Sequence, residues 1–530
     1  SDPSDLEFLR GGRVRVRHYD PVDVSAFDWT STSSTDYTWF MQMQEMRFLL
    51  PLIASRRESD HALAKDWLAR WFAVHMVGDM PRRRWGEPMT WAYRAMVFVY
   101  YLKTEMLRAT PDADVVGMLA GSILEHQQFL SQDGNFDVAS NHGLIDALGL
   151  LETTRVFANP AAIQLADEHM REIVGKSVSA RGVHMEHAAG YHFAFLRWLD
   201  EIVEYIADVP GVSDVTAREI GAAAAAMHDA AYYLQDHAGN VAQVGDTDST
   251  SAAEYAPEYR AARSRGRAEA LYDPESGYAI FKERGGSPLR YVVFRQPSVP
   301  SPMIFHRHHD ALSVIVDLDG ETLLGDGGRF EYRKSARRGY FEGFRAHNTI
   351  VPAGALQDAM PSRTFEHVSR CADLSSPDGV AWSADLSLGS LAIRRTVRMP
   401  ASSSAVVVAD SIRQGARGRL SPGSEVAVVL WNLGRDVTEL RPELNGENGT
   451  WSWTITTRRH RRVRLLLTPG DVASVVSVRV ARGEFNPMLA WYSPSQSNMR
   501  PIPAIITTLR VGEGATLETR VETVRRGIRR

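Results

Sequence analysis

The sequence predicts an α+β multidomain protein with a helical N-terminal half and an antiparallel β-sheet C-terminal half. Two observations carry this prediction. Apolar residues recur at helical spacing from about residue 37 to 236, and from residue 278 onward they fall in short runs rich in Val, Ile and Thr. With 530 residues, of which 44% are hydrophobic, the chain is long enough for two or three domains with substantial cores.

The N-terminal half contains eight predicted helices of similar length. Such a series is typical of paired helical hairpins wound into a solenoid or a toroid. No firm periodicity is visible before the first of them. The predicted helices cover residues 37–54, 59–76, 91–107, 115–130, 142–157, 161–174, 191–207 and 217–235.

The C-terminal half contains a series of short predicted strands separated by Gly, Pro, Asn and Ser. Parallel strands would need crossover helices, and because none are visible here the strands are predicted to form an antiparallel sandwich. The strands include residues 289–294, 312–318, 391–397, 405–409, 426–430, 451–455, 463–467, 475–480 and 505–511. The predicted domains are a helical domain over 1–236, a connector over 237–276 and β-sandwich domains over 277–530.

Composition excludes several classes of function. The 60 Lys and Arg and 64 Asp and Glu give a formal charge of -4, so no global basic field exists for nucleic acid or an anionic membrane. No apolar run approaches the roughly 20 residues that span a bilayer. The single cysteine, Cys371, rules out an intramolecular disulfide and a cysteine-rich zinc motif, so a metal would need His and Asp ligands.

The most informative motif is Phe305-His306-Arg307-His308-His309-Asp310, which we interpret as a strand. Side chains alternate along a strand, so His306, His308 and Asp310 are expected on one face and His309 on the other. Two imidazoles and a carboxylate on one face are hard to explain as core filling. The motif therefore predicts a metal site, a proton-transfer site, or both side by side.

Other polar groups are ambiguous when taken alone. Ser140-Asn141-His142-Gly143 precedes a predicted helix, so Ser140 or Asn141 is either an N-cap or a functional residue. Residues 181–192 place three imidazoles, a carboxylate and a phenol at the mouth of another helix. Asp326 lies in a glycine-rich turn, and His347 lies at the start of a strand, where each would by itself be structural.

Taken together and in this order, these groups resemble the heparinase II/III-like polysaccharide lyases, a class that includes alginate lyases of related build. The resemblance covers most of residues 90–350 and is fairly specific as an ordered set. It rests on Ser140-Asn141-His142-Gly143, Glu186 ahead of Gly190-Tyr191-His192, His306-x-His308-x-Asp310, Asp326-Gly327-Gly328, and Tyr340-Phe341 leading to Arg345-Ala346-His347-Asn348-Thr349.

The resemblance implies an (α/α) toroid followed by an antiparallel β-sandwich, and β-elimination at a uronic acid of an acidic polysaccharide. The C5 proton of a uronate is weakly acidic, so the carboxylate must be neutralised before a base can remove that proton. Asn141 and His142 are the candidates for neutralisation. Tyr191 is the candidate acid, or base when both events occur on one face of the sugar. His306 is a candidate base or second neutraliser, and Tyr340, less convincingly Tyr332, could line the cleft.

The resemblance also assigns His308, Asp326 and His347 to one divalent metal, with Zn²⁺ expected. Two neutral imidazoles and one carboxylate are a suitable zinc set. On the family's pattern the ion mainly braces strands under the active site, so a structural role is expected. His309 adds a competing ligand, which strand alternation disfavours.

Substrate binding by a nearly neutral protein requires local cations and aromatic platforms. Arg82, Arg83, Arg84, Trp85, Trp91 and Arg94 form a basic aromatic cluster at a predicted helix start; it is either a platform for anionic sugars or a solvated helix end. A cleft rich in Arg would favour sulfated glycosaminoglycans such as heparin or heparan sulfate, with alginate next. The predicted substrate-binding residues are Arg84, Trp91, Arg94, Glu186, His192 and Arg345.

Two other classes of function stay open. An (α/α)-toroid glycoside hydrolase would use two carboxylates, for which Asp246, Asp248 and Glu186 are available. A non-catalytic glycan-binding or polysaccharide-assembly protein could keep the same fold. The chain begins at Ser1 rather than Met, which fits a trimmed secretory leader or a shortened chain. A periplasmic or secreted location is expected, with a cytoplasmic one as the alternative.

Overall fold

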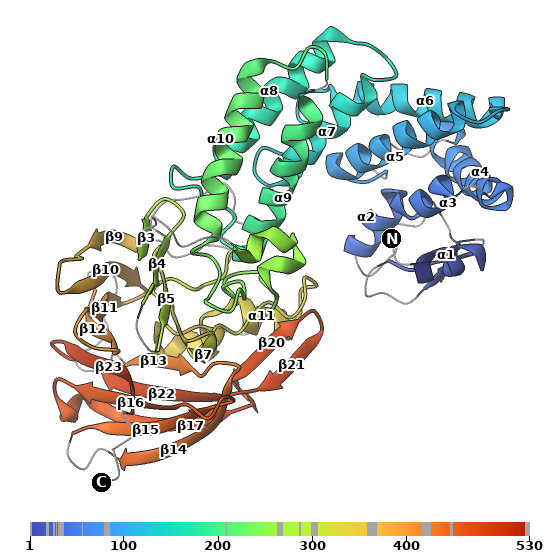
Figure 1. Cartoon of the computed structure of the whole chain (residues 1–530). Coiled ribbons are helices and arrows are strands. Elements are labelled where there is room, and N and C mark those ends of the chain that lie inside the picture. Colours follow the sequence, from blue (N-terminus) through green and yellow to red (C-terminus); the bar gives the residue numbers. More distant parts are fainter. Residues whose placement is uncertain are drawn as a thin grey trace. The chain divides into compact units, whose positions relative to one another are not determined.

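The structure is a computed structural model of the whole chain (Figure 1). Contacts divide the chain into two compact units: a helical unit, Ser1–Ser177 with Ile202–Gly221, and a sheet unit, Val178–Glu201 with Ala222–Arg530. The predicted domain boundaries at 236 and 276 stay a prediction. The structure describes residues 3–16, 21–24, 27, 29, 37–55, 57–78, 85–207, 209–261, 269–285, 288–297, 306–357, 368–415, 426–445 and 449–524.

The helical unit is built from the amphipathic segments that the sequence predicts, preceded by a helix that periodicity did not reveal, α1 (Pro3–Arg10). Two of its helices begin with residues that favour a helix start. The carboxylate of Asp112 accepts the N–H groups of Asp114 and Val115 at the start of α6, and Pro88 occupies the first turn of α5. The further helices of the unit are α2 (Tyr37–Gln44), α3 (Leu50–Ala54), α4 (Glu58–Phe72), α5 (Pro88–Met106), α6 (Ala113–Leu130), α7 (His142–Thr153) and α8 (Pro160–Ser177).

Helix α5 lies at the centre of the helical unit and packs against α6 and α7, and α7 in turn packs against α8. Gly149 of α7 allows the closest of these approaches, since a Cβ there would lie 2.4 Å from the Cβ of Ala92. Apolar side chains of both helices are fully buried at this contact, and each such residue contributes about 1.5–3 kcal/mol by burial. None of the helices in the described ranges has the length and apolar character that crossing a bilayer requires.

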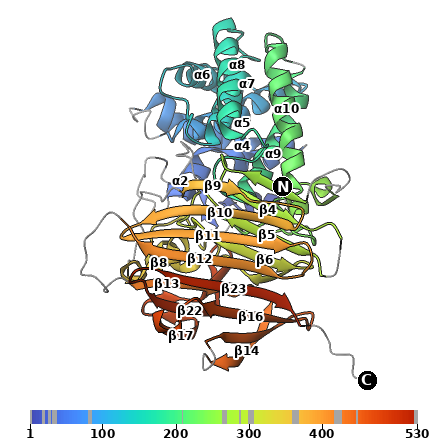
Figure 2. The same ribbon diagram turned by 90° about the vertical axis from the view of Figure 1, so that its left-hand side faces the viewer.

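The sheet unit contains three antiparallel sheets, as the prediction of an antiparallel sandwich requires (Figure 2). A five-stranded sheet runs in chain order from β3 to β7. An eight-stranded sheet has the order β14-β15-β16-β23-β12-β11-β10-β9, and a four-stranded sheet has the order β17-β22-β13-β8. Two-stranded hairpins join β18 to β19 and β20 to β21, and β1 (Arg13–Val14) pairs with β2 (Val22–Asp23) in the helical unit.

The strands of the sheet unit have the following bounds: β3 (Ala270–Asp273), β4 (Tyr278–Lys282), β5 (Arg290–Arg295), β6 (Val314–Leu318), β7 (Glu321–Leu324), β8 (Ile350–Pro352), β9 (Val368–Asp373), β10 (Gly379–Leu388), β11 (Leu391–Pro400), β12 (Val406–Gln414), β13 (Val426–Asn432), β14 (Val437–Asn445), β15 (Trp451–Thr457), β16 (Arg462–Pro469), β17 (Val475–Arg482), β18 (Glu484–Phe485), β19 (Met488–Leu489), β20 (Trp491–Ser495), β21 (Asn498–Pro501), β22 (Pro503–Arg510) and β23 (Ala515–Thr523).

One apolar core joins the three sheets. In β11, Leu391, Ile393 and Val397 are buried while Arg394 between them is exposed, which is the period of two of a strand with one solvated face. These side chains share a cluster with apolar residues of β4, β5, β6, β13 and β22. Strands β4 to β7 of the five-stranded sheet are buried along their whole length, whereas β3 alternates between buried and half-buried residues.

Three connections position the polar groups of the sheet unit. Helices α9 (Ala189–Ile206) and α10 (Asp214–Ala231) are divided between the two units, and the short helix α11 (Ala336–Glu342) follows β7. The segment predicted as a connector contains two short 3-10 helices, Ala252–Glu254 and Pro257–Ala261, and strand β3. It also contributes a central residue of the candidate site, Asp246.

Candidate functional site

The histidine motif is an irregular loop over residues 306–310, so the predicted strand is wrong; Phe305 lies outside the described residues. The backbone of this loop forms hydrogen bonds with segments that are not neighbouring strands. The N–H of Asp246 donates to the His306 carbonyl (3.2 Å), and the N–H of His309 donates to the Glu342 carbonyl (2.8 Å). Gly245, at φ 58°, makes this approach possible, because a Cβ there would lie 2.5 Å from the His306 carbonyl oxygen.

The carboxylate of Asp246 gathers the functional groups of this loop. Its Oδ2 lies 3.0 Å from His306 Nδ1 and its Oδ1 lies 2.9 Å from His308 Nε2. Arg338 of α11 also contacts both oxygens, with 3.1 Å between Nη2 and Oδ2. His306 and His308 therefore do converge, as predicted, but on a carboxylate that comes from elsewhere in the chain.

Electrostatics keep Asp246 ionised although its side chain is inaccessible. Burial by itself would raise the pKa of Asp246. The charge of Arg338 and the hydrogen bonds from His306 and His308 outweigh burial, so the pKa lies well below its usual range. A buried carboxylate with one guanidinium and two ring N–H partners is fully satisfied, which is the condition for tolerating it in the interior.

Tyr191, near the start of α9, stacks on His306 with ring centroids 3.6 Å apart. Its hydroxyl lies 2.9 Å from the hydroxyl of Tyr332, which is 39% exposed. Burial, Tyr332 and the carboxylates of Asp246 and Glu186 raise the pKa of Tyr191 well above its usual value. Tyr191 therefore keeps its phenolic proton at neutral pH, and it lies beside an imidazole at the edge of a buried charge cluster.

The loop before α9 supplies one site residue and several supports. Glu186 is buried, with its Oε2 3.6 Å from His306 Nε2. His192 was predicted to bind substrate, but both its ring nitrogens are used by the backbone: Nδ1 accepts from the His184 N–H (3.4 Å) and Nε2 donates to the Met227 carbonyl (3.1 Å). Burial lowers the pKa of His192 to about 3. This residue fixes the loop and does not face a ligand.

His308, Asp326 and His347 form a buried group suited to a metal. One ligand atom from each lies within 4.8 Å of the others. Asp326 sits in the predicted turn, where its Oδ1 accepts the Gly328 N–H (3.0 Å) and its Oδ2 lies 2.7 Å from His347 Nδ1. His308 Nδ1 and His347 Nε2 are buried and have no hydrogen-bond partner among the described residues.

These unpartnered nitrogens fit a metal, because a buried polar atom without a partner costs free energy that coordination would recover. Asp246 accepts from the other nitrogen of His308, which is the usual outer partner of a metal-ligating histidine. His309, the competing ligand in the sequence, lies instead against Phe344, with ring centroids 5.1 Å apart. The residues present can thus hold a metal ion, with His308 Nδ1 and His347 Nε2 as its nitrogen ligands.

Asp310 was expected on the same face as the two histidines, but it forms a separate buried ion pair. Its Oδ2 accepts from Arg295 Nε at 3.0 Å, and both side chains are about 1% exposed. The guanidinium of Arg295 also lies 3.9 Å from the ring centroid of Tyr278. The loop has no strand alternation, so Asp310 can turn towards β5 while His308 turns towards Asp326.

Asn141 and His142 begin α7 in the helical unit. Asn141 is buried and makes no side-chain cap, whereas the Ser140 hydroxyl accepts the His142 N–H (3.2 Å) and donates to Asp137 (2.6 Å). Ser140 is therefore the capping residue. His142 is 35% exposed at its side chain, with Nδ1 3.8 Å from the Asp137 carboxylate. Their approach to Tyr191 and His306, which belong to the sheet unit, stays a prediction.

The basic aromatic cluster of the helical unit is not a surface platform. Arg84 lies outside the described residues. Trp91 is inaccessible between Trp85 and Phe129, with ring centroids 4.6 and 3.8 Å away. Arg94 is also inaccessible and donates to the Gln44 and Trp85 carbonyls and to His126. The predicted substrate-binding role of Trp91 and Arg94 is wrong because both are core residues.

Two further predicted site residues are structural as well. Tyr340 is fully buried, and its hydroxyl donates to the Trp491 carbonyl (3.2 Å) and accepts the Trp491 N–H (3.0 Å). Arg345 is buried and donates to the Leu356 carbonyl (3.3 Å). Neither Tyr340 nor Arg345 lines the group around His306. The tyrosine that does so is Tyr332, which the sequence favoured less.

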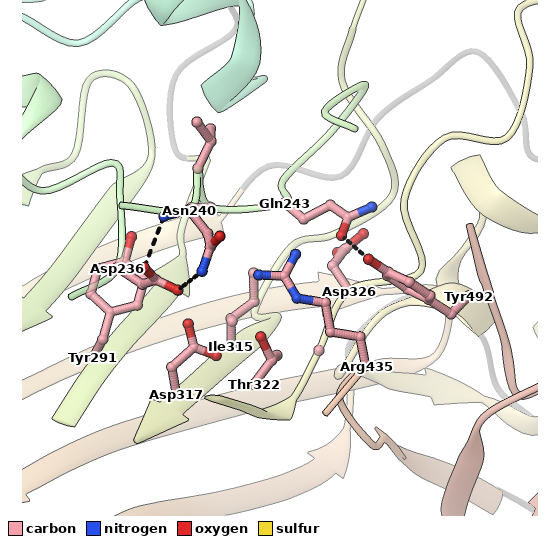
Figure 3. Close-up of a pocket in the computed structure, with 13 residues that line it drawn as sticks. Asp236, Asn240, Gln243, Tyr291, Ile315, Asp317, Thr322, Asp326, Arg435 and Tyr492 are labelled. Atoms are coloured by element: carbon pink, nitrogen blue, oxygen red, sulfur yellow. Dashed lines mark hydrogen bonds between the residues drawn. The ribbon is translucent and has the colours of Figure 1, made fainter. Parts of the chain in front are cut away.

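A small cavity of about 20 Å³ is lined in part by Asp326 (Figure 3). Asp236, which accepts from Asn240, and Tyr492, which donates to Gln243, contribute to its wall. Burial, reinforced by Asp236, raises the pKa of Asp317 in this wall to about 8. The cavity has room for about one water molecule and is far too small for a saccharide.

Comparison with known protein families identifies the sheet unit. Residues 265–522 match the family model described as heparinase II/III-like, C-terminal. This part of the chain is similar to the C-terminal domain of heparinase II/III-like proteins. It contains His306, His308, Asp326 and His347 and begins after Tyr191 and Asp246. A comparison with curated proteins gave no match for the chain.

Solved structures of polysaccharide lyases share the fold of this chain over nearly its whole length. A heparinase III structure has a TM-score of 0.76 at 13% identity and covers 98% of this chain and 84% of its own. A mutant of heparan sulfate lyase HepC from Pedobacter heparinus has a TM-score of 0.68 at 14% identity, and the match covers 99% of this chain and 84% of that one. A chondroitinase AC lyase has a TM-score of 0.52 at 10% identity, and the match covers 99% of this chain and 83% of that one. The predicted fold class, an (α/α) toroid followed by an antiparallel β-sandwich, is confirmed.

Sequence reasoning missed the residue at the centre of the site. Asp246 entered only as a possible hydrolase carboxylate, although Gly245-Asp246-Thr247-Asp248 was a visible turn with two acids. Arg338, which balances its charge, carried no signal beyond being one of several arginines in a basic stretch. Both come close to the histidines only through long-range folding, which no local pattern encodes.

Proposed function

We propose that this chain is a polysaccharide lyase that cleaves a uronic-acid-containing polysaccharide by β-elimination. The observation that carries the proposal is the stacking of Tyr191 on His306. The Asp246 carboxylate holds the His306 ring by a hydrogen bond, and the Tyr332 hydroxyl lies beside that of Tyr191. A proton donor and an imidazole 3.6 Å apart can act on adjacent atoms of one sugar ring.

The bond changes are those of an elimination. His306 Nε2 takes the C5 proton of the uronate, the C4–O bond breaks, and Tyr191 gives its proton to the departing oxygen. A C4=C5 double bond forms next to the carboxylate. Because Tyr191 and His306 are stacked, both act from the same side of the sugar. The raised pKa of Tyr191 keeps its proton available for the leaving group.

Neutralising the substrate carboxylate is assigned to Asn141 and His142. Hydrogen-bond donors aimed at the carboxylate stabilise the charge that develops when the C5 proton leaves, and removing one such donor costs about 10²–10³ in kcat in comparable sites. Asn141 and His142 are adjacent at the start of α7, so one ligand group could reach both side chains. The partial exposure of the His142 side chain fits contact with a ligand.

A divalent metal, with Zn²⁺ as our choice, would be held by His308, Asp326 and His347. When bound, such an ion would cross-link the loop that carries His306 to the β7 end and to the residues before β8, which stabilises the fold around the site. The chain's own residues then do the chemistry. Because His308 is two residues from His306, an ion that fixes His308 would also fix the position of His306.

An acidic polymer is favoured by the surface next to Tyr332. Arg333, Lys334 and Arg337 are exposed on the segment that leads into α11. These exposed cations would attract the sulfate and carboxylate groups of a substrate, although the chain as a whole carries a slight negative charge. We therefore favour a glycosaminoglycan such as heparin or heparan sulfate, with alginate next. Nucleic acid is not expected as a partner.

The alternative of a glycoside hydrolase loses its carboxylates. Asp246 is occupied by Arg338, His306 and His308, and Asp248 is paired bidentately with Arg329 at 2.9 and 2.8 Å. Glu186 is inaccessible. A hydrolase needs one free carboxylic acid and one free carboxylate or base at the scissile bond.

We place the enzyme in the periplasm or outside the cell, where acidic polysaccharides are met.

The test is the product formed from purified heparin, heparan sulfate, chondroitin sulfate, hyaluronan and alginate. Elimination gives a conjugated uronate that absorbs in the ultraviolet, and fragments whose summed mass equals that of the substrate. Hydrolysis gives fragments heavier by one water per cleavage and no new absorbance. Growth of absorbance on at least one polymer is expected. Fragments without absorbance would show a hydrolase, and no fragments from any polymer would favour a binding protein.

A further inference from the structure

We infer that Asp246 is a positioning residue that fixes the ring tautomers of both His306 and His308 and so couples metal binding to proton transfer. For His306 this rests on the proposed function, whereas for His308 it rests on the metal group alone. The assignment goes beyond the histidines themselves, because it makes one carboxylate responsible for which nitrogen of each ring is available.

The geometry leaves little choice of tautomer. Arg338 engages both oxygens of Asp246, and its other contacts, Nη2 to Glu342 (2.7 Å) and Nη1 to the Arg329 carbonyl (3.2 Å), hold it in place. A carboxylate in such a fork has acceptor oxygens only. The ring nitrogens at 3.0 and 2.9 Å must therefore both be donors: Nδ1–H of His306 and Nε2–H of His308.

Each tautomer leaves the opposite nitrogen with a lone pair. In His308 this is Nδ1, the buried atom that has no hydrogen-bond partner among the described residues and that belongs to the metal group. In a neutral His306 ring it is Nε2, the atom that a base would use, and the Glu186 carboxylate lies 3.6 Å from it. Asp246 therefore presents one lone pair to the metal and another to the substrate, from two oxygens of a single group.

Asp246 can hold this position because its own backbone is tied to the same loop. Its N–H donates to the His306 carbonyl, and the neighbouring Thr247 hydroxyl donates to the Val244 carbonyl (2.6 Å) while accepting the Gly190 N–H (3.0 Å) at the start of α9. The turn thus links the Tyr191 helix, the histidine loop and α11. A shift of Asp246 would move both imidazoles together.

The first experiment reads the tautomers directly in the wild-type protein. The full chain, loaded with Zn²⁺ and carrying ¹⁵N in its histidine rings, is examined by long-range ¹H–¹⁵N correlation, with His306→Gln and His308→Gln samples for assignment. Protonated Nδ1 in His306 and protonated Nε2 in His308 are expected. The reverse tautomer in either ring would overturn the inference without the need for any Asp246 variant.

The second experiment replaces Asp246 by asparagine. An amide has one acceptor oxygen and one donor nitrogen, so it cannot accept from both rings, and one ring must change tautomer. The expected results are a Zn²⁺ affinity about 10- to 100-fold lower in chelator competition and a kcat about 10²- to 10⁴-fold lower at saturating Zn²⁺ with KM little changed. Asp246→Glu, which keeps the carboxylate, should recover part of both.

The matched control is Asp410→Asn. Asp410 is also a buried carboxylate in a bidentate pair with a buried arginine, Arg395, at 2.7 and 2.9 Å. It should lose stability but keep Zn²⁺ affinity and the histidine spectrum. If Asp246→Asn behaved like this control, Asp246 would be only a structural brace. If the wild-type chain cleaved no uronate polymer, the proposed function would fail, while the spectrum and the Zn²⁺ affinity would still decide the role of Asp246.

Discussion

The helical unit and the sheet unit each contain a buried cluster of arginine, histidine and aromatic side chains, but only one of them is built for chemistry. In the helical unit the cluster is Arg94 with His126 and the surrounding Trp71, Trp85 and Trp91. In the sheet unit it is the group around Asp246. On the sequence level both read as concentrations of cations and aromatics next to a predicted element.

The helical cluster is closed. Arg94 Nε donates to His126 Nε2 (2.9 Å), and His126 Nδ1 donates to the Ser122 carbonyl (2.6 Å). Burial lowers the pKa of Arg94 to about 9 and, together with Arg94, holds the pKa of His126 well below its usual value. The imidazole is therefore neutral, both its nitrogens are used, and no part of the group reaches solvent.

The sheet cluster differs in two respects. Its cations are matched by the carboxylates of Asp246 and Glu342, and its outermost members, Tyr191 and Tyr332, are partly exposed. His308 and His347 each keep one buried nitrogen without a partner among the described residues. The helical cluster also keeps buried atoms without a partner among the described residues, Arg94 Nη2 and Trp91 Nε1. The sheet cluster is therefore the functional candidate because of its exposed edge and because its unused imidazole nitrogens lie in one group with the carboxylate of Asp326.

The largest expected effect is that of His306→Ala. Removal of the base should lower kcat by about 10²–10⁴-fold, the range for a general acid or base, with little change in Tm because the side chain lies at the edge of the core. Initial rates by ultraviolet absorbance and thermal unfolding check this. His228→Ala, which breaks an imidazole–carboxylate pair with Asp200 outside the site, should keep wild-type rates. Equal loss in both variants would show that His306 contributes no more to the reaction than a histidine outside the site.

Next come His308→Ala and Asp326→Ala. Loss of a ligand should weaken Zn²⁺ binding by more than about 100-fold, since loss of an outer partner alone costs 10–100-fold. Both Tm and activity should fall, because the ion braces the loop. Metal content per folded protein and Tm are the measurements. His309→Ala serves as the control and should keep one equivalent of metal, and an unchanged metal content in His308→Ala would contradict the ligand assignment.

Arg94→Ala tests the helical cluster. It removes the donor to two backbone carbonyls and His126, so the free energy of unfolding should fall by about 2–4 kcal/mol. The kcat of the folded fraction should be unchanged, as should that of Arg70→Ala, which breaks only an exposed ion pair with Asp66. Denaturant unfolding and rates corrected for folded protein measure both. A selective loss of kcat in Arg94→Ala would place this cluster in the reaction after all.

The smallest effect concerns pH. Burial raises the pKa of Asp317 to about 8, above its unfolded value near 4, so the native state binds the proton more tightly. Stability from this group is present at low pH and is lost as pH rises through 8. Between pH 5 and 8, Asp317→Asn should therefore lose less stability than wild type, by at least about 1 kcal/mol in urea unfolding. Parallel pH curves would show that Asp317 is ionised in the native state throughout.

Local patterns predicted the fold well because each half has one dominant period. The helices α4 to α10 and strands such as β11 and β16 follow apolar spacing that packing then uses directly. Helix α1 was missed because it is short and has few apolar residues. The strand predicted at the histidine motif was wrong because this segment forms a loop whose backbone contacts Gly245 and Asp246, some 60 residues earlier, a contact that no local pattern reveals.

The site was only partly predictable for the same reason. His306, His308, Asp326 and His347 came from an ordered resemblance, and the structure brings them together. Trp91, Arg94, His192 and Tyr340 are of suitable residue types, but all four side chains are buried. Exposure and partner satisfaction depend on tertiary packing, so composition could not separate them from Tyr191 and Tyr332.

The most direct test of the central claim compares wild type with Tyr191→Phe on heparan sulfate at equal concentrations of folded protein. We expect a rise in ultraviolet absorbance with wild type and, in the variant, a rate lower by at least about 100-fold at unchanged Tm. Full activity of Tyr191→Phe, with the same unsaturated product, would contradict it.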